Sequence, residues 1–391
     1  EADNTIVFLF SDHGGVLPRS KRFMFESGMQ VPLIIRFPKK YQNLAPSSPE
    51  SISDHLVNLI DLAPSILSLA GIDIPNYYQG NVFLGPKRKK DVKYVYGSRG
   101  RMDGTYDNIR TVRDKNYRYI RNYMPNRIYG QHIWYLWKSA SMQSWVDAYE
   151  RGQCNQVQKL FWEPKPPEEL YDIQKDPDNV KNLAGDPDYN HILIRMREAN
   201  ATWVRQICDA GFMPEAMMVT RARKAGKTIY EYIRSDAYPK EKIISMAEVA
   251  SMGKSEYLAK LRNGLKDEDS AVRYWAAYGC AILKENAMEA KQPLLKLLDD
   301  QCSIVAMAAA EALFYMDEKE KSFHTLGQAL NDDYDKVRLY ALNVIRTFGQ
   351  DAMPLLPQLQ EFLIHPKPHT GENYETRVAS YIVVQLTKGM V

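Results

Sequence analysis

The sequence predicts an α/β region followed by an all-α solenoid of helical repeats. In the first part of the chain, short β-rich apolar runs alternate with stretches whose apolar residues have helical spacing. In the last part, an acidic turn followed by an Ala-rich stretch recurs about every 32 residues, which is the mark of a repeat architecture. A chain of 391 residues is long enough to form two or three domains with cores of their own.

The α/β region begins with an apolar run over residues 5–10, which predicts a strand buried on both faces of a parallel or mixed sheet. A second run, residues 31–35, follows a turn at Gly28 and predicts another strand. Residues 54–71 predict an amphipathic helix that ends at Gly71 and is kinked or broken at Pro64. Its expected apolar stripe consists of Leu56, Leu59, Ile60, Ala63, Ile66, Leu67 and Ala70.

Further strands are predicted at residues 94–97, 109–113, 117–121 and 169–173, and a helix at residues 188–211. The second and third of these strands are separated by three polar residues, which predicts an antiparallel hairpin. The stretch that follows the hairpin is rich in tryptophan, and its indole rings form either a core or a wall on which sugars stack. These residues are Trp134, Trp137, Trp145 and Trp162.

Three copies of one pattern occur at residues 265–273, 298–305 and 330–338. Each copy predicts a helix, an acidic turn and a second helix, with Asp or Asn as the cap and with Val and Ala packed between helices. A degenerate last copy covers about residues 374–386, where Arg377–Val378 reverses the Val-Arg order of the earlier copies. The repeats resemble HEAT repeats.

Composition excludes several classes of protein. The 51 basic and 48 acidic residues nearly balance, which argues against non-specific nucleic-acid binding as the main task. The apolar runs are far shorter than the roughly 20 residues of a membrane span. The four cysteines have no CxxC or metal-ligand spacing and are expected to be structural thiols.

The sharpest local feature is Asp12-His13-Gly14 at the end of the first strand. Ligands bind at strand ends of open α/β sheets, and a carboxylate beside an imidazole can hold a divalent cation there, although such a turn is also a common plain loop. Lys21 has the charge to contact a tetrahedral anion, and its alternative role is that of a solvated loop lysine.

An ordered series of motifs resembles the sulfatase family of the alkaline phosphatase superfamily, of the N-sulfoglucosamine sulfohydrolase type. It extends over roughly residues 4–210, and Asn179 replaces the family's usual Glu at an expected surface position. The motifs are Ser11-Asp12-His13-Gly14, Lys21 with Phe25-Glu26-Ser27-Gly28, Val31–Ile35, Asp61–Leu67, and Glu169–Ile173 with Asp176-Pro177 and Asn182-Leu183.

The resemblance implies part of the alkaline-phosphatase-like sulfatase fold with a C-terminal antiparallel subdomain. It also implies that Asp12 and His13 bind an active-site calcium ion and that Lys21 contacts the substrate sulfate. Arg101 and Asp103 lie in the loop where similar sulfatases contact the substrate, or they form an ion pair at the hairpin edge. His132, with Trp134, is a further candidate for the sugar-binding wall.

The family's nucleophile, a formylglycine made from the first residue of a C/S-x-P-x-R motif, has no counterpart in this chain. Only Ser47-Ser48-Pro49-Glu50-Ser51 comes near it, with Ser where the motif requires Arg. Two ligands without the other carboxylates should hold calcium weakly. We therefore expect no turnover from these 391 residues alone.

The expected organisation is a sulfatase core over residues 1–137, a sulfatase C-terminal subdomain over 138–222, a connector over 223–254 and repeats over 255–391. The expected function of the full-length protein is hydrolysis of sulfate esters or sulfamates on a sulfated sugar of the glucosamine or glycosaminoglycan type. The resemblance also implies a periplasmic or secreted location. Two alternatives remain: a non-catalytic scaffold whose repeats bind a protein or a glycan, and a phosphatase or phosphodiesterase of the same superfamily.

Overall fold

The computed structural model describes residues 1–388, which divide into two compact units interleaved along the sequence. The first unit consists of Glu1–Arg99, Arg110–Arg121 and Glu168–Asn200. The second consists of Gly100–Ile109, Asn122–Pro167 and the residues from Ala201 onwards. Within the described residues, no helix has both the length and the apolar character that crossing a bilayer requires.

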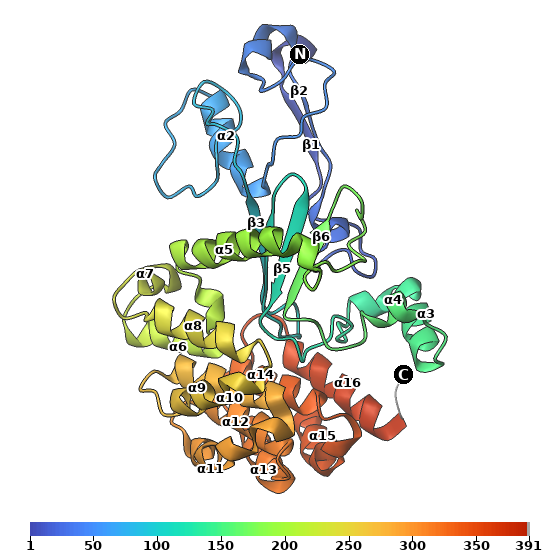
Figure 1. Ribbon diagram of the computed structural model, residues 1–391, viewed down its shortest axis with the longest axis vertical. Coiled ribbons are helices and arrows are strands. Elements are labelled where there is room, and N and C mark those ends of the chain that lie inside the picture. The colour runs from blue at the N-terminus through green and yellow to red at the C-terminus, as the bar shows by residue number, and fades with distance from the viewer. Residues whose placement is uncertain (389–391) are drawn as a thin grey trace. The chain divides into compact units, whose positions relative to one another are not determined.

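The first unit contains two antiparallel sheets. β1 (Val7–Phe10) pairs with β2 (Leu33–Arg36) in register from Val7 with Arg36 to Phe10 with Leu33. The other sheet has the order β3-β4-β5-β6 (Figure 1). Its strands are β3 (Val95–Arg99), β4 (Ile109–Arg113), β5 (Tyr117–Asn122) and β6 (Glu168–Asp172).

A helix packs on the four-stranded sheet and forms the core of the first unit with it. This helix, α5 (Asn190–Gln206), continues into the second unit at its C-terminal end. Its first half is amphipathic, so that one side of the helix meets the sheet and the other meets water. The shared core comprises Val112, Tyr119, Leu170, Leu183, Ile192, Leu193 and Met196.

The strand predicted at the start of the chain is confirmed, but its expected burial on both faces is not found among the described residues. Val7, Leu9 and Phe10 are 46%, 56% and 48% exposed, and Ile34 on β2 is 62% exposed. The partner strand is antiparallel, and no third strand joins this sheet within residues 1–388. On this two-stranded sheet, apolar side chains that the sequence pattern assigns to a core are thus exposed.

The predicted helix at residues 54–71 is shorter than expected and buries a different face. α2 spans Leu62–Leu69, so that Pro64 lies in its first turn, where the missing N–H breaks no helical hydrogen bond. Gly71 follows with φ +70°, as a C′ glycine should. The buried positions include Ser65 and Ser68, whereas Ile60 and Ile66, from the expected stripe, are 53% and 49% exposed.

Backbone hydrogen bonding explains why the serine face of α2 is buried. Ser65 Oγ accepts the amide of Phe83 at 3.0 Å, and Ser68 Oγ accepts the amide of Lys87 at 3.1 Å. An extended segment thus lies against the helix and needs short side chains that accept hydrogen bonds. The hydrogen bonds to these buried amides decide which face of α2 is buried, although the other face carries more apolar side chains.

The second unit holds most of the helices, including the stacked repeats (Figure 1). The helix-turn-helix prediction is confirmed for each copy, and the inner helices α10, α12 and α14 are almost wholly buried. Short helices precede them: α1 (Glu26–Met29) in the first unit, and α3 (Ala140–Glu150), α4 (Gln156–Lys159), α6 (Glu215–Lys224), α7 (Ile229–Ile233) and α8 (Lys240–Ala250). The repeat helices are α9 (Leu258–Gly264), α10 (Ser270–Leu283), α11 (Lys291–Lys296), α12 (Ser303–Phe314), α13 (Lys319–Ala329), α14 (Asp335–Arg346), α15 (Leu356–Ile364) and α16 (Tyr374–Lys388).

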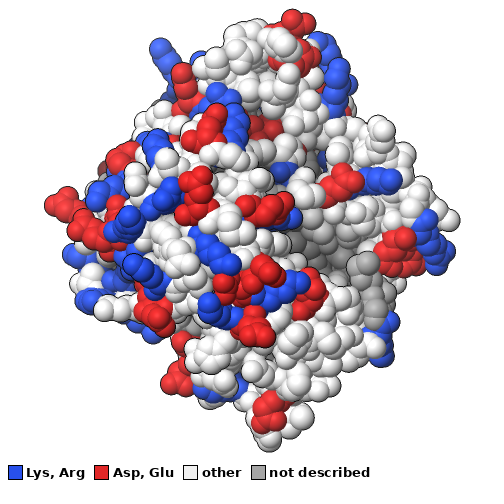
Figure 2. Space-filling model, turned by 60° about the horizontal axis from the view of Figure 1, so that its bottom comes forward, with Lys and Arg blue, Asp and Glu red and all other residues white. Residues whose placement is uncertain are grey.

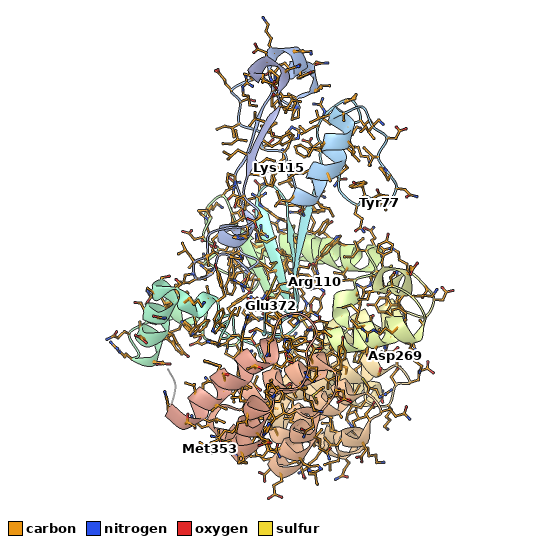
Figure 3. The ribbon with its side chains drawn as sticks, turned by 180° about the vertical axis from the view of Figure 1, so that it is seen from behind. Tyr77, Arg110, Lys115, Asp269, Met353 and Glu372 are labelled. Carbon is orange, nitrogen blue, oxygen red and sulfur yellow. The ribbon has the colours of Figure 1, made fainter. Side chains whose placement is uncertain are left out.

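The acidic turns of the repeats have a recurring structure. Asp269, labelled in Figure 3, caps α10 by accepting the amides of Ala271 and Val272. The expected side-chain cap is not found at α12 and α14, which begin after Cys302 and Tyr334. In those turns an Asp two residues before the cap position accepts its amide instead, at 2.9 Å from Asp300 and 2.8 Å from Asp332. The acidic residues therefore organise the turn more often than they cap the helix.

All four cysteines are free thiols, as expected. Burial raises the pKa of the Cys280 thiol to about 12, so that it stays protonated at neutral pH. Acidic and basic side chains are interspersed on the face of the molecule shown in Figure 2, in keeping with the near balance of charge.

The four tryptophans between residues 134 and 162 play different parts. Trp137, Trp145 and Trp162 pack together, with ring centroids 6.1 Å apart for the first and third and 5.7 Å apart for the second and third. Phe161 stacks on Trp145 at 4.7 Å. Trp134 is 46% exposed and is thus available to a ligand.

Candidate functional site

The residues predicted from the sequence as site residues fall in both units. Asp12, His13 and Lys21 belong to the first unit, whereas Arg101, Asp103 and His132 belong to the second. Each group is assembled by contacts within its own unit, and the two groups raise different chemical possibilities.

Asp12 and His13 lie in the turn that follows β1. Asp12 Oδ2 is 3.5 Å from His13 Nε2, and His13 Nδ1 is 2.5 Å from the carbonyl oxygen of Gly14. The Asp12 side chain is 82% exposed, so its carboxylate has room to bind a cation. The turn thus presents one carboxylate and one imidazole side by side.

This pair is not a complete calcium site. Calcium takes about six to eight ligands, and one carboxylate with one imidazole supplies only a part of them. Among residues 1–388, no three His, Cys, Asp or Glu side chains are grouped so that they could hold a metal ion. The described residues therefore do not fit a calcium ion by themselves.

The segment that carries Lys21 lies directly against this turn. The Lys21 amide donates to the Gly15 carbonyl at 3.0 Å, and the Gly14 amide donates to the Gly28 carbonyl at 3.2 Å. A Cβ atom on Gly14 would lie 2.1 Å from the carbonyl oxygen of Ser27, so only glycine permits this approach. The fold thus brings together the two motifs that the resemblance ties to the cation and the sulfate.

Glu26 anchors the Lys21 segment to the four-stranded sheet. Its side chain is 5% exposed and pairs with Arg118 at 2.6 Å and with Arg113 at 3.1 Å. Burial lowers the pKa of Arg118, and the charge of Glu26 partly opposes that change. A buried carboxylate between two guanidinium groups holds the loop in one position.

The expectation for Asn179 was wrong, because this residue is buried rather than on the surface. It is 1% exposed, and its Oδ1 accepts the Glu26 amide at 2.7 Å. Its φ of +54° is a left-handed conformation, which Asn adopts more readily than most residues do. Arg19 donates to its carbonyl oxygen at 2.9 Å. Asn179 therefore helps to position the segment that carries Lys21.

Arg101 and Asp103 lie in a tight turn of the second unit. Two backbone hydrogen bonds between Met102 and Thr105 close this turn. The Arg101 guanidinium donates two hydrogen bonds to the Glu215 carboxylate, one of 3.2 Å and one shorter. It also donates to the Asp103 carbonyl oxygen at 2.5 Å. Burial disfavours its charge, but Glu215 outweighs that effect and raises the pKa of Arg101. Arg101 thus forms an ion pair, with Glu215 rather than with a neighbour on the hairpin.

His132 is a stacked, neutral histidine. Its ring lies 3.7 Å from that of Tyr381 with an interplanar angle of 8°. Burial, together with the nearby charge of Arg346, lowers the pKa of His132 to about 3. Arg346 also donates to the His132 carbonyl at 3.2 Å. A sulfate at this position would meet an aromatic surface and not an imidazolium.

The pKa of His132 predicts a loss of stability in acid. Between pH 6.5, its ordinary pKa, and pH 3, the unfolded chain binds a proton here that the folded chain does not, so the free energy of unfolding falls as the pH falls. His132→Phe keeps a ring for Tyr381 but cannot titrate. We expect the urea midpoint of the parent chain to drop more than that of the variant between pH 7 and pH 4. Equal drops would contradict the low pKa.

Asp103 and His132 border one shallow pocket of the second unit, with an empty volume of about 320 Å³ that includes space open to solvent. Its walls come from the turn at Asp103, from the segment around Trp134 and from the first turn of α16. The lining residues are Asp103, Gly104, His132, Ile133, Trp134, Tyr135, Tyr374, Arg377 and Val378.

Sequence reasoning missed the wall that α16 provides. Tyr374 and Arg377 lie about 240 residues beyond Trp134, and no local pattern joins them. The signal that could have found them was the reversed order at Arg377–Val378. In the first and third copies the arginine binds the acidic turn, as Arg273 does through the carbonyl oxygens of Asp267 and Glu268. Arg377 does not make this contact and faces the pocket instead.

The inner helices of the repeats contact the segments that carry this pocket. Tyr278 on α10 donates to Asn126 Oδ1 at 2.6 Å, and Glu311 on α12 pairs with Arg127 at 2.7 Å. Asn343 on α14 donates to the Gly104 carbonyl at 2.8 Å and accepts the Tyr106 amide at 3.1 Å. These three positions recur at spacings of 33 and 32 residues, as their numbers show. One face of the stack is therefore contacted by the chain's own residues 104–106 and 126–127.

Two stretches of the chain match known families. Residues 18–131 match the model for the C-terminal domain of N-sulphoglucosamine sulphohydrolase, and residues 227–313 match the model for HEAT repeats. The chain therefore contains a segment similar to the C-terminal domain of this sulfatase family and a segment similar to HEAT repeats. Both resemblances seen in the sequence are confirmed.

Individual relatives belong to the same class. The chain is 37% identical over 227 residues to an ulvan-active sulfatase of Formosa agariphila, a match that covers 58% of this chain and 37% of that protein. It is 25% identical over 219 residues to the N-sulphoglucosamine sulphohydrolase of Homo sapiens, covering 51% of this chain and 41% of that one. The chain thus spans about two fifths of the length of these relatives.

A solved structure is also similar in part. It is a complex with D-glucosamine-2-N,6-O-disulfate, described as its substrate, and it is 22% identical to this chain, with a TM-score of 0.37. The match covers 53% of this chain and 35% of that chain.

Proposed function

We propose that this chain is the C-terminal portion of a sulfatase that hydrolyses a sulfate ester or a sulfamate on a sugar of the glucosamine or glycosaminoglycan type. One observation carries the proposal: the Asp12-His13 turn and the Lys21 segment are joined by backbone hydrogen bonds, at 3.0 Å between Lys21 and Gly15. The match of residues 18–131 to the sulphohydrolase family supports it. A cation-binding turn and an anion-binding lysine side by side suit the neutralisation of a sulfate group.

In this proposal Asp12 and His13 are two of the ligands of a calcium ion, and Lys21 contacts the sulfate. The ion would supply positive charge next to the reacting sulfate group. The remaining ligands and the nucleophile would come from residues outside these 391, because the sequence lacks the nucleophile motif and residues 1–388 hold no group of three metal-ligating side chains. The 391-residue chain is accordingly expected to release no sulfate by itself. In this proposal the protein is periplasmic or secreted, as the resemblance to sulfatases implies.

Replacing Lys21 by alanine in the full-length protein tests this function. We expect release of sulfate from N-sulfoglucosamine or glucosamine-6-sulfate to fall by about 10²- to 10³-fold, because a fixed positive charge at the sulfate is lost. Lys260→Ala on α9, at an exposed lysine of the repeats, is the matched control and should keep the parent rate. The measurement is liberated sulfate by ion chromatography.

Two outcomes would count against the proposal. If Lys21→Ala kept the parent rate, Lys21 would have no contact with the sulfate. If the full-length protein released sulfate from ulvan oligosaccharides and from neither glucosamine sulfate, the sulfatase class would stand and the glucosamine type would be wrong. The second arm is needed because one relative is an ulvan-active sulfatase.

A further inference from the structure

The pocket between the Asp103 turn, Trp134 and α16 combines features that recognise anionic sugars. Its empty volume of about 320 Å³ is largely open to solvent, so that a ligand would lie along the surface of the pocket and not inside a closed cavity. Trp134 and Tyr135 are 46% and 45% exposed, so flat apolar surfaces border it. Such rings pack against the C–H faces of sugars.

Arg377 provides the anion-binding group. Its guanidinium lies 4.7 Å from the ring centroid of Trp134 and 5.6 Å from that of Tyr374, which keep it at the wall of the pocket. Its carboxylate partner is Glu372, labelled in Figure 3, at 2.8 Å. The two side chains are 36% and 63% exposed, and an ion pair so open to water is weak enough to be exchanged for a ligand anion.

A second cation lies near the pocket, on the indole of Trp134. Lys138 Nζ lies 3.6 Å from the ring centroid of Trp134, so two positive charges border the same indole. Asp103 also belongs to the lining of the pocket. Arg101 takes no part, because Glu215 occupies its fork.

We propose that this pocket is a subsite for an anionic sugar unit, in which Arg377 binds the sulfate or carboxylate group and Trp134 contacts the sugar ring. The identity of the ligand rests on the proposed function, since it is a unit of the same sulfated glycan. The last helix of the HEAT repeats then has a direct role in binding, because Tyr374 and Arg377 both come from its first turn. The repeats thus add a wall to this subsite within the second unit.

Binding of a heparin-derived tetrasaccharide to the 391-residue chain tests the subsite by isothermal titration calorimetry. Arg377→Met should weaken binding by about tenfold or more, since a charge-assisted hydrogen bond is lost. Arg262→Met is the matched control, because Arg262 forms a similarly exposed pair with Glu289 at 2.9 Å, and it should leave the affinity unchanged. Trp134→Ala should weaken the tetrasaccharide and its desulfated form alike, because the ring contact does not depend on sulfate.

The desulfated tetrasaccharide, which keeps its uronate carboxylates, identifies the anion. Loss of the Arg377 effect with this ligand assigns the contact to sulfate, and its persistence assigns it to a carboxylate. Absence of binding, or equal binding by the parent, Arg377→Met and Trp134→Ala chains, would overturn the subsite. Sulfate release by the full-length protein is read separately: binding that depends on Arg377 without any release would reject the proposed function and leave the subsite standing.

Discussion

Replacing Glu311 by glutamine is expected to lower the free energy of unfolding of the chain by about 3–5 kcal/mol, because it leaves a buried guanidinium without its charge partner. Glu311 is fully buried on α12, and Arg127 is 5% exposed. Burial alone would lower the pKa of Arg127, but the charge of Glu311 reverses the effect and raises it. The pair also holds the repeats to the segment at residues 126–127.

Urea denaturation, followed by far-ultraviolet circular dichroism, measures this loss. Glu289→Gln is the control, because Glu289 pairs with Arg262 at the surface and its side chain is 72% exposed, and it should change the midpoint far less. Glu311→Leu combined with Arg127→Met removes both charges and should recover much of the lost stability. A midpoint for Glu311→Gln within error of the parent would show that this ion pair contributes little.

Replacing Glu26 by glutamine is expected to have a comparable effect in the first unit, about 3–5 kcal/mol, and to loosen the loop that carries Lys21. Arg118, whose side chain is 4% exposed, would lose its carboxylate, and Arg113 would lose the same partner. Because burial already disfavours the charge of Arg118, removal of Glu26 should lower its pKa further.

Hydrogen exchange separates the local effect from the global one. In the Glu26→Gln chain, amides of residues 19–30 should exchange faster than in the parent, while the inner repeat helices, such as α10, should keep their protection. Glu50→Gln, at an exposed loop position, is the control. Unchanged exchange in residues 19–30 would show that the loop does not depend on Glu26 for its position.

Local pattern was enough to predict most of the elements. β1, β4, β5 and β6 begin and end within about two residues of the predicted strands, because runs of β-branched and aromatic residues between polar turns have few other stable conformations. The repeats were equally clear, since each copy repeats the same turn and the same buried helix. The Asp12-His13-Gly14 turn was singled out for its residue types and its place after a strand.

Several features were decided by contacts between distant residues. The buried face of α2 is set by the amides of Phe83 and Lys87, which the helix's own apolar pattern does not reveal. Asn179 is buried because its side chain accepts the amide of Glu26, 153 positions earlier. Each feature depends on hydrogen bonds between segments that are not neighbours in the chain. Such partners produce no periodic pattern in the sequence, so a pattern of residue types cannot predict them.

The amino-acid sequence by itself determined the resemblance to sulfatases, the repeats and the choice of Asp12, His13 and Lys21 as candidate residues, because ordered motifs and periodic patterns are local properties of a chain. Tertiary structure alone decided that the Lys21 segment lies against the Asp12-His13 turn and is held by Glu26. It also decided that His132 is neutral and that Arg377 borders the pocket beside Trp134. Burial and the approach of distant side chains set pKa values and build sites, and both arise only when the chain is folded.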